Sequence, residues 1–382
     1  MGTRTMMRKV SGVGVTLALL AGVAACNGDD APDDIADPAD PVETEEPAPS
    51  GGGGGIQDIP SYGEVDESRL ATAVVDEHWR LDPASGSAMT VAELDGEHVL
   101  LAGTRRGEVE IYDLADGQLR DSIAVHDNAI RDIHAVEVAG EPTVVSVEVG
   151  LAKVWSTGTG DVLFDIDLGT NYDFTTVVEY QGKPVFVNGS KEVVMTDLET
   201  GDTLQHYKYD LGLSPSHGNV VDLNGGTVLV ADNVVGGQYG VGAWDLDDGS
   251  TVYDYPMYQH EDRSINKMAS GYLGETVLTV TGDFGGEIVA WDVSSNTEYG
   301  PSVNPDGSSV TALAVVELGD TLVGIAGTLD RTVMLWNVKT GAEIEVFDSP
   351  ATGISQMEIA EMDGRPVVVV GGDGWVMPYW LG

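Results

Sequence analysis

Short apolar runs recur along the chain at a regular spacing. Beyond about residue 90, paired segments such as HVLLAG with EVEIY, and TLVGIAG with RTVMLW, are bounded by Gly, Asn or Asp. Runs of this length with turn residues at both ends predict β-strands of ~5–7 residues. After each pair, a turn containing Gly or Asn leads to a further run such as AEIEVFD. The pattern therefore predicts an all-β chain of short antiparallel strands.

One position recurs once in every repeat and serves as an anchor. It is the central aromatic residue of segments such as VWSTGTG, AWDLDDG and LWNVKTG, with threonine in its place in the third repeat. The anchors, separated by 43, 41, 48, 47, 45 and 43 residues, are Tyr112, Trp155, Thr196, Trp244, Trp291, Trp336 and Tyr379. Four short strands for every ~45 residues are typical of one propeller blade. The spacing therefore predicts a seven-bladed β-propeller of four-stranded antiparallel blades.

The two ends of the repeat region indicate how the ring closes. The sequence leaves only three strands for the last blade, and an open outer edge there would promote aggregation. Residues 71–81 (ATAVVDEHWRL) form an apolar run with no other predicted partner. We expect this N-terminal strand to supply the missing outer strand and close the ring, which places the propeller at residues 69–382.

The Trp-Asp pairs of AWDLDDG and AWDVSSN, and the segment TLDRTVMLWNVKTG, resemble repeats of the WD-repeat β-propeller family over about residues 71–382. The resemblance implies a hydrogen-bond network built on a turn aspartate before the anchor and a histidine at the connection between blades. The matching positions are Asp283 (in a turn two residues longer), Asp330, Asp373, His126 and His217. Blades one to four lack the turn aspartate, so the implied network is incomplete.

The chain begins with the features of a secretory signal. Arg4, Arg8 and Lys9 precede an uncharged stretch, VSGVGVTLALLAGVAA, which is shorter than the ~20 residues of a membrane-spanning helix. The small residues before Cys26 resemble the lipobox of bacterial lipoproteins, which implies cleavage after residues 1–25 and a diacylglycerol on the thiol of Cys26. An ordinary signal cleaved nearby is the alternative.

Residues 26–68 differ in composition from the repeats. Between residues 27 and 55 the sequence has nine acidic residues, five prolines, no basic residue and a run of five glycines. Such a segment cannot bury enough apolar surface to offset its ordering entropy. We expect a disordered tether between the lipid and the propeller.

The charge of the chain restricts its partners. With 63 Asp and Glu against 18 Lys and Arg, the formal net charge is −45, which repels the phosphate backbone of nucleic acids. A single cysteine excludes a disulfide framework and a cysteine-cluster metal site. The acidity is also compatible with adaptation to high salt, and calcium binding in an Asp-rich loop stays open.

Signals for catalysis are poor. The sequence contains no P-loop, no HExxH, no GxSxG elbow, and no histidine cluster with metal-ligand spacing. We therefore predict no catalytic residue, cofactor or metal site. A propeller enzyme such as a lactonase-like hydrolase, and a quinoprotein-like envelope assembly lipoprotein, remain as alternatives, although the docking tryptophans expected of quinoprotein repeats are missing.

The resemblance also implies where a partner binds. In WD-repeat propellers the face formed by the blade connections and the turns between second and third strands usually receives proteins or peptides. The residues expected there are Arg105, Arg106, Tyr239, Asp262 and Arg263. Arg and Tyr are enriched at interface hot spots, and the alternative is that these are ordinary solvated turn residues.

These observations predict a secreted protein, lipid-anchored to the outer face of the bacterial cell membrane. We expect a monomeric, non-catalytic protein-interaction scaffold or binding module, with membrane contact through Cys26 and a protein or peptide partner.

Overall fold

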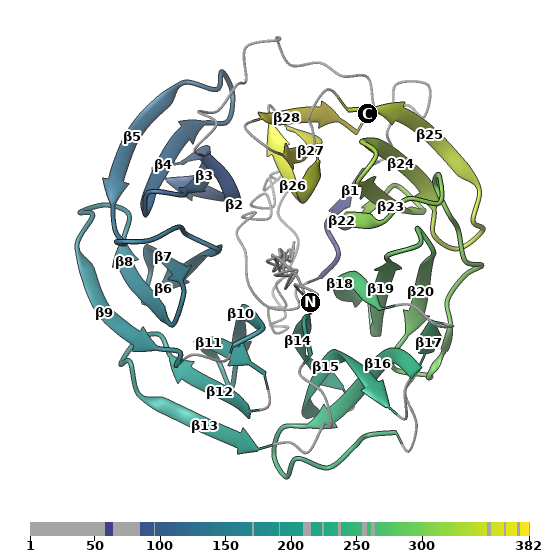
Figure 1. Ribbon diagram of the computed structural model, residues 1–382, viewed down its shortest axis with the longest axis horizontal. Coiled ribbons are helices and arrows are strands. Elements are labelled where there is room, and N and C mark those ends of the chain that lie inside the picture. Colours follow the sequence, from purple (N-terminus) through teal and green to yellow (C-terminus); the bar gives the residue numbers. More distant parts are fainter. Residues whose placement is uncertain are drawn as a thin grey trace, which may run out of the picture.

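Seven antiparallel β-sheets are arranged as a ring around a central axis (Figure 1). The structure is a computed structural model that describes residues 58–63 and 85–381, with gaps at 95, 170–171, 191, 209–214, 224, 236–237, 254–257, 261–263, 350–352, 363 and 373–374. The described residues contain no helix, and hence none that is long and apolar enough to cross a membrane. The predicted fold, an all-β seven-bladed propeller with antiparallel blades, is confirmed.

Each blade is a meander whose strands pair in sequence order, with the first strand nearest the axis. Blades one to three consist of β2 (Ser85–Leu94), β3 (Glu97–Thr104), β4 (Glu108–Asp113) and β5 (Leu119–Ala124); β6 (Asp132–Val138), β7 (Glu141–Glu148), β8 (Leu151–Ser156) and β9 (Val162–Asp167); and β10 (Phe174–Tyr180), β11 (Lys183–Gly189), β12 (Glu192–Asp197) and β13 (Thr203–Lys208).

The remaining blades follow the same order. Blades four to seven consist of β14 (Gly218–Leu223), β15 (Gly226–Val235), β16 (Gln238–Asp245) and β17 (Tyr258–His260); β18 (Ile265–Leu273), β19 (Thr276–Asp283), β20 (Ile288–Asp292) and β21 (Thr297–Glu298); β22 (Val310–Leu318), β23 (Thr321–Thr328), β24 (Thr332–Asn337) and β25 (Glu343–Asp348); and β26 (Ile354–Met362), β27 (Arg365–Gly372) and β28 (Trp375–Trp380).

In blades one, three, four, five and six, the residue after the anchor explains the recurring turn between third and fourth strands. In blade three the Asp197 carboxylate accepts hydrogen bonds from the backbone N–H groups of Glu199 (2.8 Å) and Thr200 (3.2 Å). Gly201 then adopts a φ of +77°, a conformation that glycine reaches without a Cβ penalty. The aspartate of a Trp-Asp pair such as Asp245 acts in the same way. An Asp or Asn directly after the anchor, with a Gly or Asn four residues further on, is therefore a local turn signal.

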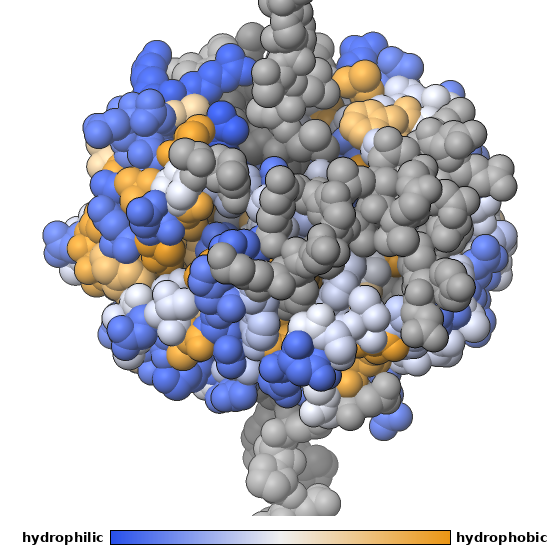
Figure 2. Space-filling model, turned by 60° about the horizontal axis from the view of Figure 1, so that its bottom comes forward, coloured by the Kyte–Doolittle hydropathy of each residue, from blue (hydrophilic) through white to orange (hydrophobic). Residues whose placement is uncertain are grey.

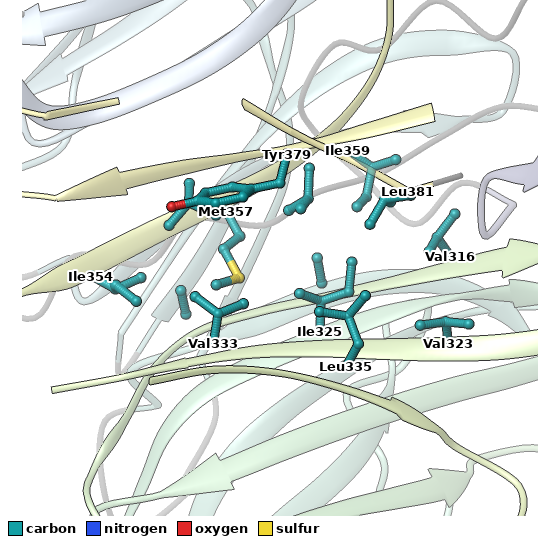
Figure 3. Close-up of a cluster of buried hydrophobic side chains, with 14 of the residues drawn as sticks. Val316, Val323, Ile325, Val333, Leu335, Ile354, Met357, Ile359, Tyr379 and Leu381 are labelled. Atoms are coloured by element: carbon teal, nitrogen blue, oxygen red, sulfur yellow. The ribbon is translucent and has the colours of Figure 1, made fainter. Parts of the chain in front are cut away.

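The hydrophobic core lies between neighbouring blades. Second strands such as β23 are apolar at nearly every position because both of their faces are covered, whereas the rim strand β25 is mostly exposed. Between blades six and seven, Ile325 and Leu335 point toward Met357 and Tyr379 (Figure 3). Because every blade needs both neighbours to cover its faces, the ring becomes stable as a whole.

A glycine in β23 shows how the anchors fit. Gly324 pairs with Trp336 in the sheet, and a Cβ built on Gly324 would lie 2.3 Å from an atom of the indole ring. No side chain larger than hydrogen fits there without moving the anchor.

A short N-terminal strand pairs with the innermost strands. β1 (Ser61–Tyr62) runs parallel to β22, and Asp58 forms a bridge beside Tyr272 of β18. The backbone hydrogen bonds of this segment are Ile59 N–H to Tyr272 O (2.7 Å), Glu317 N–H to Pro60 O (2.6 Å) and Gly319 N–H to Tyr62 O (2.8 Å). Ile59 is buried in the core between blades five and six. We call residues 58–62 the strap.

The strap changes the predicted organisation near the N-terminus. It belongs to the propeller, although the sequence placed residues 58–62 in the tether, because Ile59 and Tyr62 reach apolar clusters of the ring. The predicted closing strand at 71–81, the tether apart from residues 58–63, and Cys26 lie outside the described residues. Within those residues the seventh blade has three strands.

Candidate functional site

The topology gives the ring two faces. Turns between first and second strands, and between third and fourth strands, lie on one face, which we call the acidic face. Turns between second and third strands, together with the connections between blades, lie on the opposite face, which we call the arginine face. Loops on such a rigid scaffold are where binding residues usually lie.

Arg105 and Arg106 are exposed on the arginine face, in the turn between β3 and β4. The Thr104 hydroxyl fixes this turn by accepting hydrogen bonds from the N–H groups of Arg106 (3.2 Å) and Glu108 (3.1 Å). Of the other predicted partner residues, Tyr239 lies in β16 but its side chain is not described. Asp262 and Arg263 lie outside the described residues. Of the five predicted residues, the structure therefore shows the side chains of two, the consecutive Arg105 and Arg106, on this face.

The acidic face carries a repeated carboxylate that the sequence analysis missed. The penultimate residue of the innermost strand is acidic in six blades and tyrosine in the other, namely Glu93, Glu137, Glu179, Asp222, Tyr272, Glu317 and Glu361. In every blade this residue pairs with the second residue of the second strand. The seven residues are therefore equivalent and form a ring around one mouth of the axis. An acidic residue between apolar residues just before the first turn, as in VAEL, VVEL and IAEM, was the available signal.

One predicted histidine takes part in a buried network. His126 Nε2 lies 3.0 Å from the carbonyl oxygen of Ser146 and 2.8 Å from its hydroxyl oxygen. A carbonyl can only accept, so Nε2 carries the proton. The Ser146 hydroxyl also accepts the indole N–H of the anchor Trp155 at 3.1 Å. Burial lowers the pKa of His126, which favours the neutral ring.

The other predicted network residues have different surroundings. His217 is buried, and its backbone N–H donates to the carboxylate of Asp232 at 2.7 Å. Asp283, the last residue of β19, accepts the N–H groups of Gly285 (2.7 Å) and Glu287 (2.8 Å). Asp330 is exposed, and Thr328 holds its turn instead, as Thr104 does in blade one. Asp373 lies outside the described residues.

A buried polar cluster lies on the axis, and the sequence analysis missed it as well. Asp132, at the start of β6, accepts a short hydrogen bond from the Thr175 hydroxyl of the neighbouring blade. His134 Nε2 lies 3.2 Å from the Asp132 carboxylate and 3.1 Å from the Thr175 hydroxyl. All three residues are buried.

Two more ionisable groups of this cluster come from blades that do not adjoin blade two. Burial lowers the pKa of Lys267 in β18 to about 8, and the negative charge of Asp132 opposes that shift. Burial also raises the pKa of Glu358 in β26 well above its usual range, and Asp132 adds to that effect. Blades two, five and seven can interact in this way only across the axis. Asp132, Lys267 and Glu358 therefore share one axial space.

Uncharged polar side chains are buried on the same innermost strands. Asn219 and Gln356 are both almost fully buried, and neither amide has a hydrogen-bond partner among the described residues. In the part of the chain that is described, no group of three or more His, Cys, Asp or Glu side chains is placed to hold a metal ion.

Comparisons with known proteins support the fold. No protein-family model matches the chain, and no curated protein matches it. Among solved structures, the chain is similar to the crystal structure of the computationally designed Ika8 protein, with 18% sequence identity and a TM-score of 0.56. The match covers 78% of this chain and 97% of that one. A likeness at this identity concerns the fold alone.

Proposed function

We propose that this chain is an extracytoplasmic, lipid-anchored scaffold of the WD-repeat kind, which holds binding partners and has no catalytic activity of its own. The observation that carries the proposal is the chemical difference between the two faces of one rigid ring. One axial mouth has acidic residues at equivalent positions, while the opposite face exposes arginines such as Arg105 and Arg106. A ring with two unlike faces suits a protein that holds two partners at once.

Several features support the parts of this proposal. The small residues before Cys26 support lipidation, and the acidic, proline-rich segment after it supports a tether. The Ser146 hydroxyl, which contacts both the anchor Trp155 and His126, supports a likeness to WD-repeat blades. Because electrostatic complementarity steers association, we expect the acidic face to take a protein or peptide partner with basic side chains.

The anchoring is tested by fractionation of cells that produce the full chain. Cys26→Ser should move the protein from the membrane to the soluble fraction, because each buried CH₂ of the acyl chains contributes ~0.8 kcal/mol to membrane binding. Intact-mass measurement of the wild-type protein should show the lipid on Cys26. An unmodified Cys26 in the membrane-extracted protein contradicts the anchor.

The scaffold function is tested by cross-linked capture from membranes. The wild-type protein is compared with a variant carrying Glu93→Gln, Glu137→Gln and Glu179→Gln, exposed positions that leave the core unchanged. We expect a basic protein or peptide to be captured by the wild type and lost from the variant. Recovery of a chemically converted small molecule would favour the enzyme alternative instead.

A further inference from the structure

Three exposed apolar side chains occupy one repeated position on the arginine face. The large apolar residues that are exposed within the described part of the chain are Leu119, Val149, Val162, Leu163, Phe284, Leu329 and Val346. Val149, Phe284 and Leu329, with 56%, 43% and 59% of their surfaces exposed, each come directly after the second strand of a blade. Equivalent positions in a ring lie at the same height, so these side chains form a level set on one face.

The turns that carry these side chains are fixed by the connections between blades. Leu329 N–H donates to the carbonyl oxygen of Ser309 at 2.9 Å, and Phe284 N–H donates to that of Ser264 at 3.3 Å. The backbone of these residues is therefore held in place by hydrogen bonds while their side chains are exposed. Apolar side chains also lie among hydrophilic ones on the surface shown in Figure 2.

Four exposed arginines lie on the same face, which are Arg105, Arg106, Arg131 and Arg331. Ile130 N–H donates to Thr104 O (3.0 Å) and Arg131 N–H donates to Val147 O (2.7 Å), which joins the turn of Arg105 to that of Val149. Among the described residues, no ion pair involves these four arginines. By contrast, Arg120 binds Glu97 and Asp113, and Arg365 lies over the ring of Trp380.

The acidity of the protein reduces the positive charge of the arginine face in part. The innermost strands have six to ten residues, so the two faces are separated by roughly 20–30 Å. Charges are screened over ~8 Å at physiological ionic strength. Four carboxylates, Asp127, Asp173, Asp306 and Asp330, are also exposed on the arginine face. Attraction to anions there is consequently partial, and apolar contact must contribute to any binding.

We propose that the arginine face docks on an anionic lipid bilayer. Val149, Phe284 and Leu329 enter the boundary between headgroups and acyl chains, and the arginines bind lipid phosphates. A flat surface reaches level side chains on blades two, five and six at the same time, which favours a bilayer over a protein partner. Docking turns the acidic face away from the membrane and toward a basic partner. The inference rests on the proposed function, because the lipid on Cys26 brings the ring to the membrane.

The tether is long enough for this orientation. The strap fixes the chain at the acidic face, and residues 27–57 separate it from Cys26. A segment of that length spans up to ~100 Å when extended, which is several times the separation of the two faces.

The test uses the full-length lipidated protein reconstituted in vesicles of phosphatidylglycerol and phosphatidylcholine. Cys26 is the only cysteine in the sequence, so a second one can be labelled with a fluorophore. Leu329→Cys places the label on the arginine face, and Glu137→Cys places it on the acidic face as a matched control. Spin-labelled lipid should quench the label at 329 several-fold more than the label at 137, and added salt should reduce the difference.

Further variants separate the two contributions. Arg105→Gln, Arg106→Gln and Arg131→Gln together should lower the ratio of docked to undocked protein roughly a hundredfold at low salt, since each basic residue near an anionic surface is worth about fivefold. Phe284→Ser should reduce quenching in both anionic and neutral vesicles. Lys339→Gln, on the acidic face, should change nothing.

Three results would overturn the proposal. These are equal quenching of the two labels, stronger quenching at 137, and shielding of the label at 329 only after membrane proteins are added, which would assign the face to a protein partner. Flotation with the vesicles tests the anchor separately. If the wild type does not float through its lipid, the anchor is wrong, and unlipidated protein added to the same vesicles still tests docking.

Discussion

The hydroxyl of Ser146 connects three groups of one blade junction, and its removal should have a predictable cost. It accepts the indole N–H of Trp155 at 3.1 Å and shares the Nε2–H of His126 with the Ser146 carbonyl. All three side chains are buried. Ser146→Ala removes the oxygen atom while changing the side-chain volume little, so the loss of hydrogen bonds should dominate its effect.

The magnitude depends on which donor loses its partner. His126 keeps the Ser146 carbonyl at 3.0 Å, so its loss is partial. Trp155 loses the acceptor of its indole N–H, and a buried donor without a partner costs ~1–3 kcal/mol. We therefore expect Ser146→Ala to lower the free energy of unfolding by about 2 kcal/mol, which corresponds to a fall of roughly 3 °C in melting temperature for a domain of about 300 residues.

Thermal and denaturant unfolding of four proteins would test this reasoning. Ser122→Ala, at an exposed position of β5, is the control and should stay within ~0.5 kcal/mol of the parent. Combining Ser146→Ala with Trp155→Phe should give less than the sum of the single effects, because the indole N–H is already absent. An Ser146→Ala melting point within about 1 °C of the parent, or strict additivity, would refute the network.

Further predictions concern the strap, the closing strand and the axial cluster. Ile59→Asp should lower the melting temperature, because it places a charge in a buried apolar site, while deletion of residues 27–55 should leave that temperature nearly unchanged. Deletion of residues 69–82 should open the ring, with a lower melting temperature and altered size-exclusion behaviour; a deletion protein that stays monomeric and melts with the parent would rule out closure by residues 71–81. The pKa of Glu358 is raised in the folded state, so its contribution lowers stability as pH rises from about its unfolded pKa of 4.5 toward the folded value. Glu358→Gln should flatten that slope in denaturant unfolding measured across pH, and an unchanged slope would contradict the burial effect.

Most of the fold could be predicted from the sequence because each blade is specified locally. The anchors, the turns that follow them and the apolar second strands act within about 45 residues of one another. The turn between second and third strands shows the limit of the family resemblance. The resemblance implies that an aspartate six residues before the anchor, such as Asp330, holds this turn. In blades one and six the hydroxyls of Thr104 and Thr328, at the strand ends, do so instead.

The strap could not be predicted from a sequence pattern. Its residues, DIPSY, show neither alternation nor a long apolar run, and they follow a stretch of acidic, proline-rich and glycine-rich composition. Their partners Tyr272 and Glu317 lie more than 200 residues away. Pairing at that separation becomes favourable only after the ring has formed, so the local sequence of the strap does not predict it.

The axial cluster could not be predicted from the sequence for a related reason. Asp132, Lys267 and Glu358 lie far apart in the sequence, in strands that also carry other polar residues, and only ring closure brings blades two, five and seven together. Apolar packing connects each blade to its neighbours and is nearly equivalent from one junction to the next. Charges that act across the axis instead distinguish blades that do not touch. Burial of these charges costs stability, and the attraction between Asp132 and Lys267 offsets part of that cost.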